Sequence, residues 1–134
     1  MGNGNITNER SIIMEIHVTT TSDLTIVAIN GKLDANTIAD FQKSSADLPV
    51  MPTVLDLSRL EYMSSSALRA LLQMKREFSK QGVPVVIAGS DGLVDKVLRV
   101  SGFEQIFVLF PSVDEAVRTM THGGADRAGL CTAD

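Results

Sequence analysis

The stretch that decides the fold runs from Val54 to Leu68 and reads Val-Leu-Asp-Leu-Ser-Arg-Leu-Glu-Tyr-Met-Ser-Ser-Ser-Ala-Leu. Its apolar start predicts a buried strand, which a short loop connects to a long amphipathic helix opened by consecutive serines. A serine oxygen at a helix start can accept the amide hydrogens that lack a partner in the first turn. The same amides, together with the helix dipole, favour a negative charge. Ser64, Ser65 and Ser66 can therefore act as a helix cap, and they can also carry a phosphate.

On the N-terminal side of this stretch, the sequence predicts two strands and a helix. Apolar and polar residues alternate over 12–19, which is typical of a half-buried strand. A polar turn leads to a second strand over 24–29, so the two strands should form an antiparallel hairpin. Asn30-Gly31 is a strong turn signal and should end the second strand. A helix is expected from Asp34 to about Ser45.

On the C-terminal side, strands and helices alternate. The helix over 66–81 has apolar residues on one side, Leu68, Leu71, Leu72, Met74 and Phe78, and cationic residues elsewhere, Arg69, Lys75, Arg76 and Lys80. Apolar runs, caps and glycines predict the remaining elements: a strand over 83–88, a helix from Ser90 or Asp91 to Val100 that buries Leu93, Val94, Val97 and Leu98, a strand over 106–110, and a helix from Ser112 to about Met120.

The predicted order of elements is β-β-α-β-α-β-α-β-α, which defines an α/β fold. After the hairpin each strand is followed by a helix, and this alternation favours parallel pairing with right-handed crossovers. We therefore expect a single mixed β-sheet of about five strands with about four helices packed on it. This domain should span residues 12–120, after an N-terminal extension over 1–11 and before a mobile C-terminal tail over 121–134.

Composition excludes several classes of protein. A chain of 134 residues with 44% hydrophobic and 21% charged residues can bury the core of one domain and is not a disordered tail. The net charge is −4 and the 12 Lys and Arg are scattered without a basic stripe, so we expect neither nucleic-acid nor membrane binding. The single cysteine, Cys131, cannot form an internal disulfide, which agrees with a reducing compartment. The sequence has no signal-peptide pattern and no spanning apolar run, so the expected location is the cytoplasm.

Catalytic and metal-binding motifs are scarce. A serine nucleophile needs a neighbouring base, and the imidazoles are His17, on the less apolar face of an early strand, and His122, in the predicted tail. Met63 and Ala67 stand where a Gly-x-Ser-x-Gly elbow around Ser65 needs glycines. No group of Cys and His has zinc-ligand spacing, and no Walker or Rossmann phosphate loop occurs. We therefore expect no enzyme activity, no metal and no cofactor.

Three segments of the chain carry patterns that occur together in one known family. Residues 30–37, Asn-Gly-Lys-Leu-Asp-Ala-Asn-Thr, resemble a G-x-L-D-x-x-T segment. Residues 54–58 and 62–68 resemble a strand with D-L-S followed by M-D-S-S-G-L, and residues 101–103, Ser-Gly-Phe, resemble an S-G-L/F turn. In this order and spacing, from about Ile12 to Met120, the chain resembles the STAS family of anti-sigma-factor antagonists. The resemblance implies the STAS fold.

The resemblance also implies a partner switch. Such proteins bind an anti-sigma factor that is a serine kinase of the histidine-kinase-like ATPase type, and this binding frees the sigma factor. The kinase phosphorylates one serine at the helix start, which ends the binding, and a metal-dependent serine phosphatase restores it. On this sequence the phosphorylated position falls on Ser65, and the expected partner-binding residues are Asp34, Thr37, Ser64, Ser65 and Ser66.

Two positions depart from the family pattern. The acidic residue before the phosphorylated serine is Ser64 here, and the glycine two residues after it is Ala67. Ser64 removes a charge beside the acceptor, and Ala67 raises the helix propensity by about 1 kcal/mol over glycine. These departures suggest a divergent partner, or a member of the family that has lost phosphorylation.

Simpler interpretations of the same residues remain open. The serines can be only a helix cap, Asp34 can cap the first helix, and Asp56 can pair with a backbone amide. The methionines can be ordinary core residues. The second functional class is a STAS-type scaffold or accessory subunit that binds its partner constitutively, without phosphate.

Overall fold

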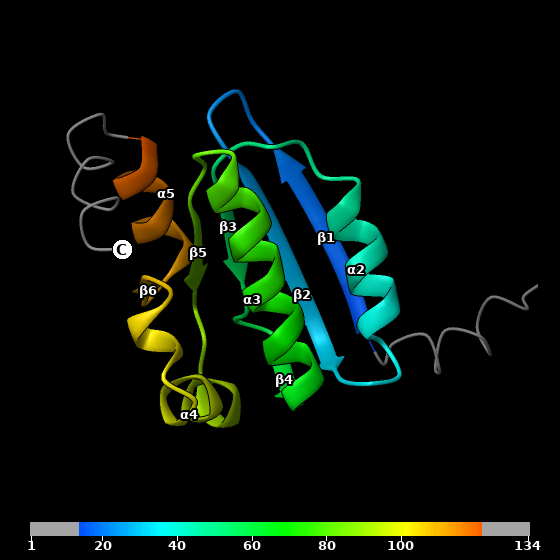
Figure 1. The fold of residues 1–134 in the computed structure, drawn as a ribbon. Helices are drawn as coiled ribbons and strands as arrows, with labels where there is room; N and C mark the ends of the chain where they lie inside the picture. Colours follow the sequence, from blue (N-terminus) through cyan, green and yellow to red (C-terminus); the bar gives the residue numbers. More distant parts are fainter. Residues whose placement is uncertain (1–13, 122–134) are drawn as a thin grey trace, which may run out of the picture.

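The computed structural model describes residues 14–121, so the expected N-terminal extension and the expected tail beyond Thr121, with His122 and Cys131, lie outside the described residues. The elements, labelled as in Figure 1, are β1 (Met14–Thr20), β2 (Thr25–Leu33), α2 (Ile38–Ala46), β3 (Thr53–Asp56), β4 (Leu60–Met63), α3 (Ser65–Lys80), β5 (Val85–Ala88), α4 (Gly92–Val100), the 3₁₀ helix η1 (Phe103–Gln105), β6 (Leu109–Phe110) and α5 (Val113–Thr121). Within residues 14–121, no helix combines the length and the apolar content needed to cross a membrane.

The strands form one mixed sheet, as predicted. β1 and β2 pair as an antiparallel hairpin, from Thr20 opposite Thr25 to Met14 opposite Gly31. The other neighbours pair in parallel, and the spatial order is β1-β2-β3-β5-β6, with β4 beside the end of β2. The carboxyl ends of β2, β4 and β5 therefore lie at one edge of the sheet, the lower edge in Figure 1. We call it the carboxyl edge.

Helices cover both faces of the sheet. Alternate side chains of a strand point to opposite faces, and here they join two apolar clusters. Phe41 of α2 and Leu71 of α3 belong to one cluster with Leu55 of β3. Ala116 of α5 belongs to the other cluster with Val54 of β3. Thus α2 and α3 share one face, in front of the sheet in Figure 1, and α5 covers the opposite face.

The predicted α/β class with four helices is confirmed, but the described sheet has six strands. The additional strand is β4, whose buried residues, Leu60 and Met63, are three positions apart and show no alternation. The prediction that Asn30-Gly31 ends the second strand is wrong, because β2 continues to Leu33. Gly31 has a φ of 94° beside an irregularity in the pairing of β2 with β4, so this glycine permits a bulge inside a strand.

Two predicted boundaries are also wrong. α2 begins at Ile38, four residues after the predicted start, because residues 34–37 form a turn. The predicted strand over 106–110 is reduced to the two residues of β6. The residues before β6 do not form a strand. Phe103 begins the 3₁₀ helix η1, and its ring stacks on that of Phe107 with the ring centroids 5.6 Å apart.

Candidate functional site

The serines at the start of α3 differ in what their hydroxyls do. Ser64 has an extended backbone and is the N-cap, and its Oγ accepts the amide hydrogen of Ala67 at 3.2 Å. Ser65 is the first helical residue and is exposed, and Ser66 follows it half-buried. Among residues 14–121, no hydrogen bond involves the hydroxyl of Ser65 or Ser66. One serine therefore caps the helix, and the next offers a free, accessible hydroxyl.

The loop after β2 is held by its own side chains. The Asp34 carboxylate accepts the amides of Asn36 at 2.9 Å and Thr37 at 3.3 Å, so it organises the turn before α2 and is not the N-cap of that helix. The Thr37 hydroxyl accepts the amide of Asp34 at 2.9 Å and donates to the carbonyl of Lys32 at 3.0 Å. Thr37 is only 7% exposed. This predicted partner-binding residue therefore has a hydroxyl that is used inside the loop, whereas Asp34 is half-buried and reaches the surface.

The strand β4 brings this loop to the serines. Leu33, the last residue of β2, lies opposite Met63, the last residue of β4. The amide of Ser64 then donates to the carbonyl of Leu33 at 3.0 Å, so the residue before Asp34 bonds directly to the cap of α3. Figure 1 shows the start of α2 and the start of α3 at the same edge of the sheet. Asp34 and the serines therefore follow adjacent strand ends.

Two exposed apolar side chains lie near this edge and were not predicted. Tyr62, in β4 two residues before Ser64, is 41% exposed. Leu93, in the first turn of α4, was expected in the core, and that prediction is wrong because it is 52% exposed. It precedes the buried Val94 by one residue, which places it about 100° away around the helix. Nothing in the sequence pattern distinguishes Tyr62, because β4 itself was not recognised as a strand.

The loops after β3 and β5 meet further along the carboxyl edge. The Asp56 carboxylate accepts the amide of Ser58 at 3.0 Å and its hydroxyl at 2.7 Å, which confirms that Asp56 pairs with a backbone amide. Gly89 has a φ of 76°, and a Cβ there would lie 2.9 Å from the Cβ of Ser58. The absence of a side chain at Gly89 thus permits the close approach of the two loops.

Charge in the first turns of α4 is locally balanced. The Asp95 carboxylate accepts the Arg99 Nε at 2.8 Å and the Ser90 hydroxyl at 2.8 Å. The Arg99 guanidinium, and then the Ser90 hydroxyl, hold the pKa of Asp95 below its usual value. Arg99 also pairs with Glu104 at 3.0 Å. These groups stabilise each other, whereas Asp91, the exposed N-cap of α4, takes part in no ion pair among residues 14–121.

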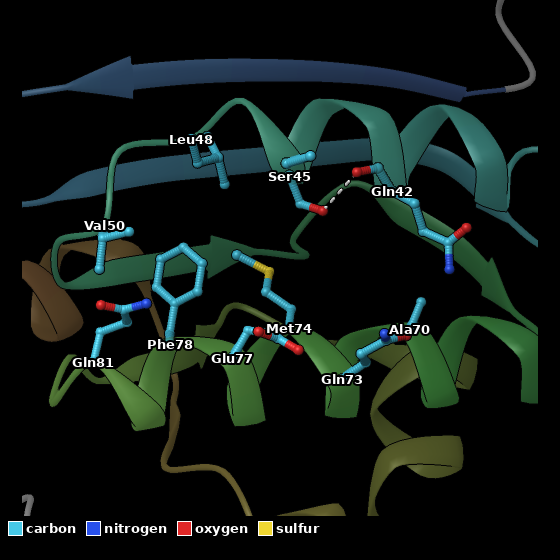
Figure 2. A pocket seen from close by; sticks show the side chains of 11 residues that line it. Gln42, Ser45, Leu48, Val50, Ala70, Gln73, Met74, Glu77, Phe78 and Gln81 are labelled. Carbon is cyan, nitrogen blue, oxygen red and sulfur yellow. Dashed lines mark hydrogen bonds between the residues drawn. The ribbon is translucent and has the colours of Figure 1, made fainter.

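A groove of about 390 Å³ lies between α2 and α3 on the helical face of the sheet. Figure 2 shows Leu48, Val50 and Phe78 near one end of it, and further along the groove the Ser45 hydroxyl donates to the Gln42 carbonyl at 3.1 Å. Glu77 is the single titratable residue in its lining. Within the described part of the chain, no group of three or more His, Cys, Asp or Glu is arranged to hold a metal ion. The groove has no arrangement of side chains suited to acid, base or nucleophilic chemistry.

The sequence and the fold match one family. The STAS domain model matches residues 15–116, and the chain belongs to the STAS domain family. A STAS-domain containing protein of Pseudomonas aeruginosa is 32% identical to this chain over 83 residues. The match covers 60% of this chain and 82% of the relative, which also shows that the chain belongs to the family.

Solved structures share the fold at lower identity. An anti-sigma factor antagonist from Mycobacterium paratuberculosis is 21% identical with a TM-score of 0.72, and the match covers 80% of this chain and 93% of that one. The Bacillus cell fate determinant SpoIIAA in its phosphorylated form is 16% identical with a TM-score of 0.61, and the match covers 77% of this chain and 96% of that one. The predicted STAS fold is therefore confirmed.

Proposed function

We propose that this protein is a phosphorylation-controlled partner-switching regulator. In its unmodified form it binds an anti-sigma-factor-type serine kinase, a histidine-kinase-like ATPase, and thereby releases the target of that kinase. Phosphorylation of Ser65 ends the binding, and a serine phosphatase restores it. The regulator itself needs no catalytic residue, since the kinase and the phosphatase supply the chemistry.

The observation that carries this proposal is the division of roles between adjacent serines. Ser64 caps α3, so a phosphate on Ser65 removes no hydrogen bond that holds the helix. The phosphate would add about −1.5 to −2 charges at neutral pH beside the free amides of the first turn, where negative charge is favourable. We therefore expect the domain to tolerate the modification with little loss of stability.

The partner should tolerate the phosphate far less than the domain does. A doubly charged group in a packed interface must lose its hydration, which is costly unless the partner supplies matching charges. Asp34 follows the adjacent strand end, so its carboxylate adds repulsion between like charges. The exposed side chain of Tyr62 offers an aromatic contact of the kind that protein interfaces favour. Binding should therefore fall steeply on phosphorylation while the fold is retained.

A constitutive STAS-type scaffold is the second candidate. The observation that favours it is the departure at Ser64 and Ala67, where the family pattern has an acidic residue and a glycine. In this alternative the cap formed by Ser64 would account for the serines, and the partner would stay bound without phosphate.

Intact-mass analysis and peptide mapping separate these candidates. Incubation with a histidine-kinase-like ATPase that binds the chain, and with ATP, should add one phosphate, located on Ser65. Ser65→Ala should stay unmodified and remain bound, whereas Ser65→Asp should lose about tenfold or more in affinity. Ser66→Ala is the matched control and should be phosphorylated normally. A phosphate found on Ser64 or Ser66 would show that Ser65 is not the residue that controls binding. The absence of phosphate from all three serines would favour the constitutive scaffold.

A further inference from the structure

The charge of α3 differs from that of the rest of the chain. This helix contains four of the 12 Lys and Arg but only one of the 16 Asp and Glu, so it carries a charge of +3 in a protein of net charge −4. No basic stripe is visible along the sequence, because the cations are separated along the chain. Their spacing on α3, however, brings several of them to one side of the helix.

Three of the cations share one side of α3. Arg69, Arg76 and Lys80 are seven and four residues apart, and these spacings return to the same helix face. They line one hollow of about 530 Å³ together with Ser66, so the row of cations begins beside the serines. We call these three residues the cationic stripe. It extends about 16 Å along the helix, from one turn after Ser65 to the last residue of α3.

The charges of the stripe are unpaired within the described part of the chain. The ion pairs among residues 14–121 are His17 with Glu15 and Arg99 with both Asp95 and Glu104. All three residues of the stripe are exposed and take part in none of these pairs.

Helix stability explains the arrangement only in part, since it accounts for Lys80 in the last turn, where a cation suits the helix dipole. Arg76 and Lys80 are like charges at a spacing of four, which disfavours the helix. The remaining cation of α3, Lys75, is oriented differently, with its Nζ 5.6 Å from the centroid of the Phe107 ring. Glu77 is the one carboxylate in the lining of the same hollow, so this side of α3 keeps a net charge of +2 on an otherwise acidic protein.

We infer that the cationic stripe is the docking surface for an acidic segment of the partner protein, an inference that rests on the proposed function because it extends the same binding face. Arg69 is four residues after Ser65, the spacing at which helix side chains meet. A phosphate on Ser65 can thus pair with Arg69 and withdraw it from the acidic segment. Phosphorylation then weakens binding by competition for a cation as well as by repulsion.

The charge pattern favours a protein partner over other polyanions. A nucleic acid or an anionic membrane extends well beyond the stripe and would meet the acidic remainder of the molecule. A folded protein can instead place a short acidic segment over the stripe alone. Beside Arg76 and Lys80 a second hollow of about 580 Å³ includes Leu72 and Ile106, which can accept apolar side chains of such a segment.

Binding of a fluorescent amphipathic peptide of Glu and Leu to the full chain tests the inference. Arg69→Gln/Arg76→Gln/Lys80→Gln should weaken binding about tenfold or more and flatten its dependence on salt. The matched control, Lys43→Gln/Lys96→Gln/Arg118→Gln, removes the same charge elsewhere and should bind within about twofold of the native chain. Amide shifts in NMR titrations should change mainly along α3.

Several outcomes would overturn the inference. Equal losses in the stripe and control variants would show that net charge alone attracts the peptide. Stripe-dependent binding of a DNA duplex or of vesicles containing phosphatidylglycerol, without binding of the peptide, would assign the stripe to another polyanion. The peptide assay needs no phosphate, so a chain that no kinase modifies can still bind the peptide. In that case the proposed phosphorylation switch fails, and the cationic stripe still stands as a docking surface for an acidic segment.

Discussion

At the scale of the residue, substitutions of Ser64 and Ser65 test whether the helix cap and the proposed phosphorylation site are separate residues. Ser64→Ala removes the acceptor for the Ala67 amide and should cost about 1 kcal/mol of unfolding free energy. Ser65→Ala, the matched control, removes no hydrogen bond among the described residues and should stay within about 0.5 kcal/mol of the native chain. Urea unfolding midpoints measure both. Equal losses would mean that the two hydroxyls share the cap.

The sequence could predict a cap at this point but could not say which serine forms it. Ser64, Ser65 and Ser66 are equally good caps by residue type, and the predicted helix began at Ser66. In the structure the cap is Ser64, whose amide donates to the carbonyl of Leu33, a residue far away in the sequence. Local patterns contain no information on that contact.

Asp34 has a structural role that must be separated from partner binding. Asp34→Ala should weaken partner binding, but it also removes the acceptor for two loop amides. Asp34→Asn keeps an acceptor oxygen and removes the charge, so it serves as the matched variant. If the charge contacts the partner, both variants should lose affinity, by about 2–5 kcal/mol for a buried pair and far less for a rim pair. Calorimetric titration with the partner measures this, and a loss confined to Asp34→Ala would point to loop geometry instead.

At the scale of the element, the helices and the hairpin were predictable and β4 was not. The apolar spacing of Leu71, Met74 and Phe78 indicates a helix without any knowledge of its neighbours. β4 has four residues with no alternation, and it forms because β2 bends at Gly31 and continues alongside it. A short strand whose partner is distant in sequence leaves little local pattern.

Gly89 provides a test of the close approach between two loops. Gly89→Ala introduces a Cβ 2.9 Å from that of Ser58 at a positive φ, and it should cost more than about 1 kcal/mol of unfolding free energy. Gly82→Ala is the matched control, because Gly82 has a φ of 77° but a Cβ added there would have no neighbouring atom within 4 Å. Thermal unfolding should show the larger loss at Gly89, and Ser58→Gly should restore part of it. A similar loss in both variants would mean that backbone strain alone is responsible.

At the scale of the whole molecule, the candidate site depends on the sheet more than on any single loop. The general rule that parallel strands end at one edge predicts that loops distant in sequence gather there. It does not predict which loops become neighbours, since that follows from the strand order. Asp34 and the serines are close because β4 lies beside β2, and this pairing was visible only in the structure.

The pairing of β2 with three other strands determines which parts of the sheet can unfold locally. β1, β3 and β4 all bond to β2, whereas β6 pairs at two residues only. Backbone amides of β2 should therefore exchange with deuterium only through global unfolding, and those of β6 through local opening. Exchange followed by mass spectrometry under native conditions checks this order, and equal rates in β2 and β6 would contradict it. The loop after β2 and the serines after β4 are thus anchored to the strand that we expect to exchange most slowly, which would let a kinase reach Ser65 without any part of the sheet opening.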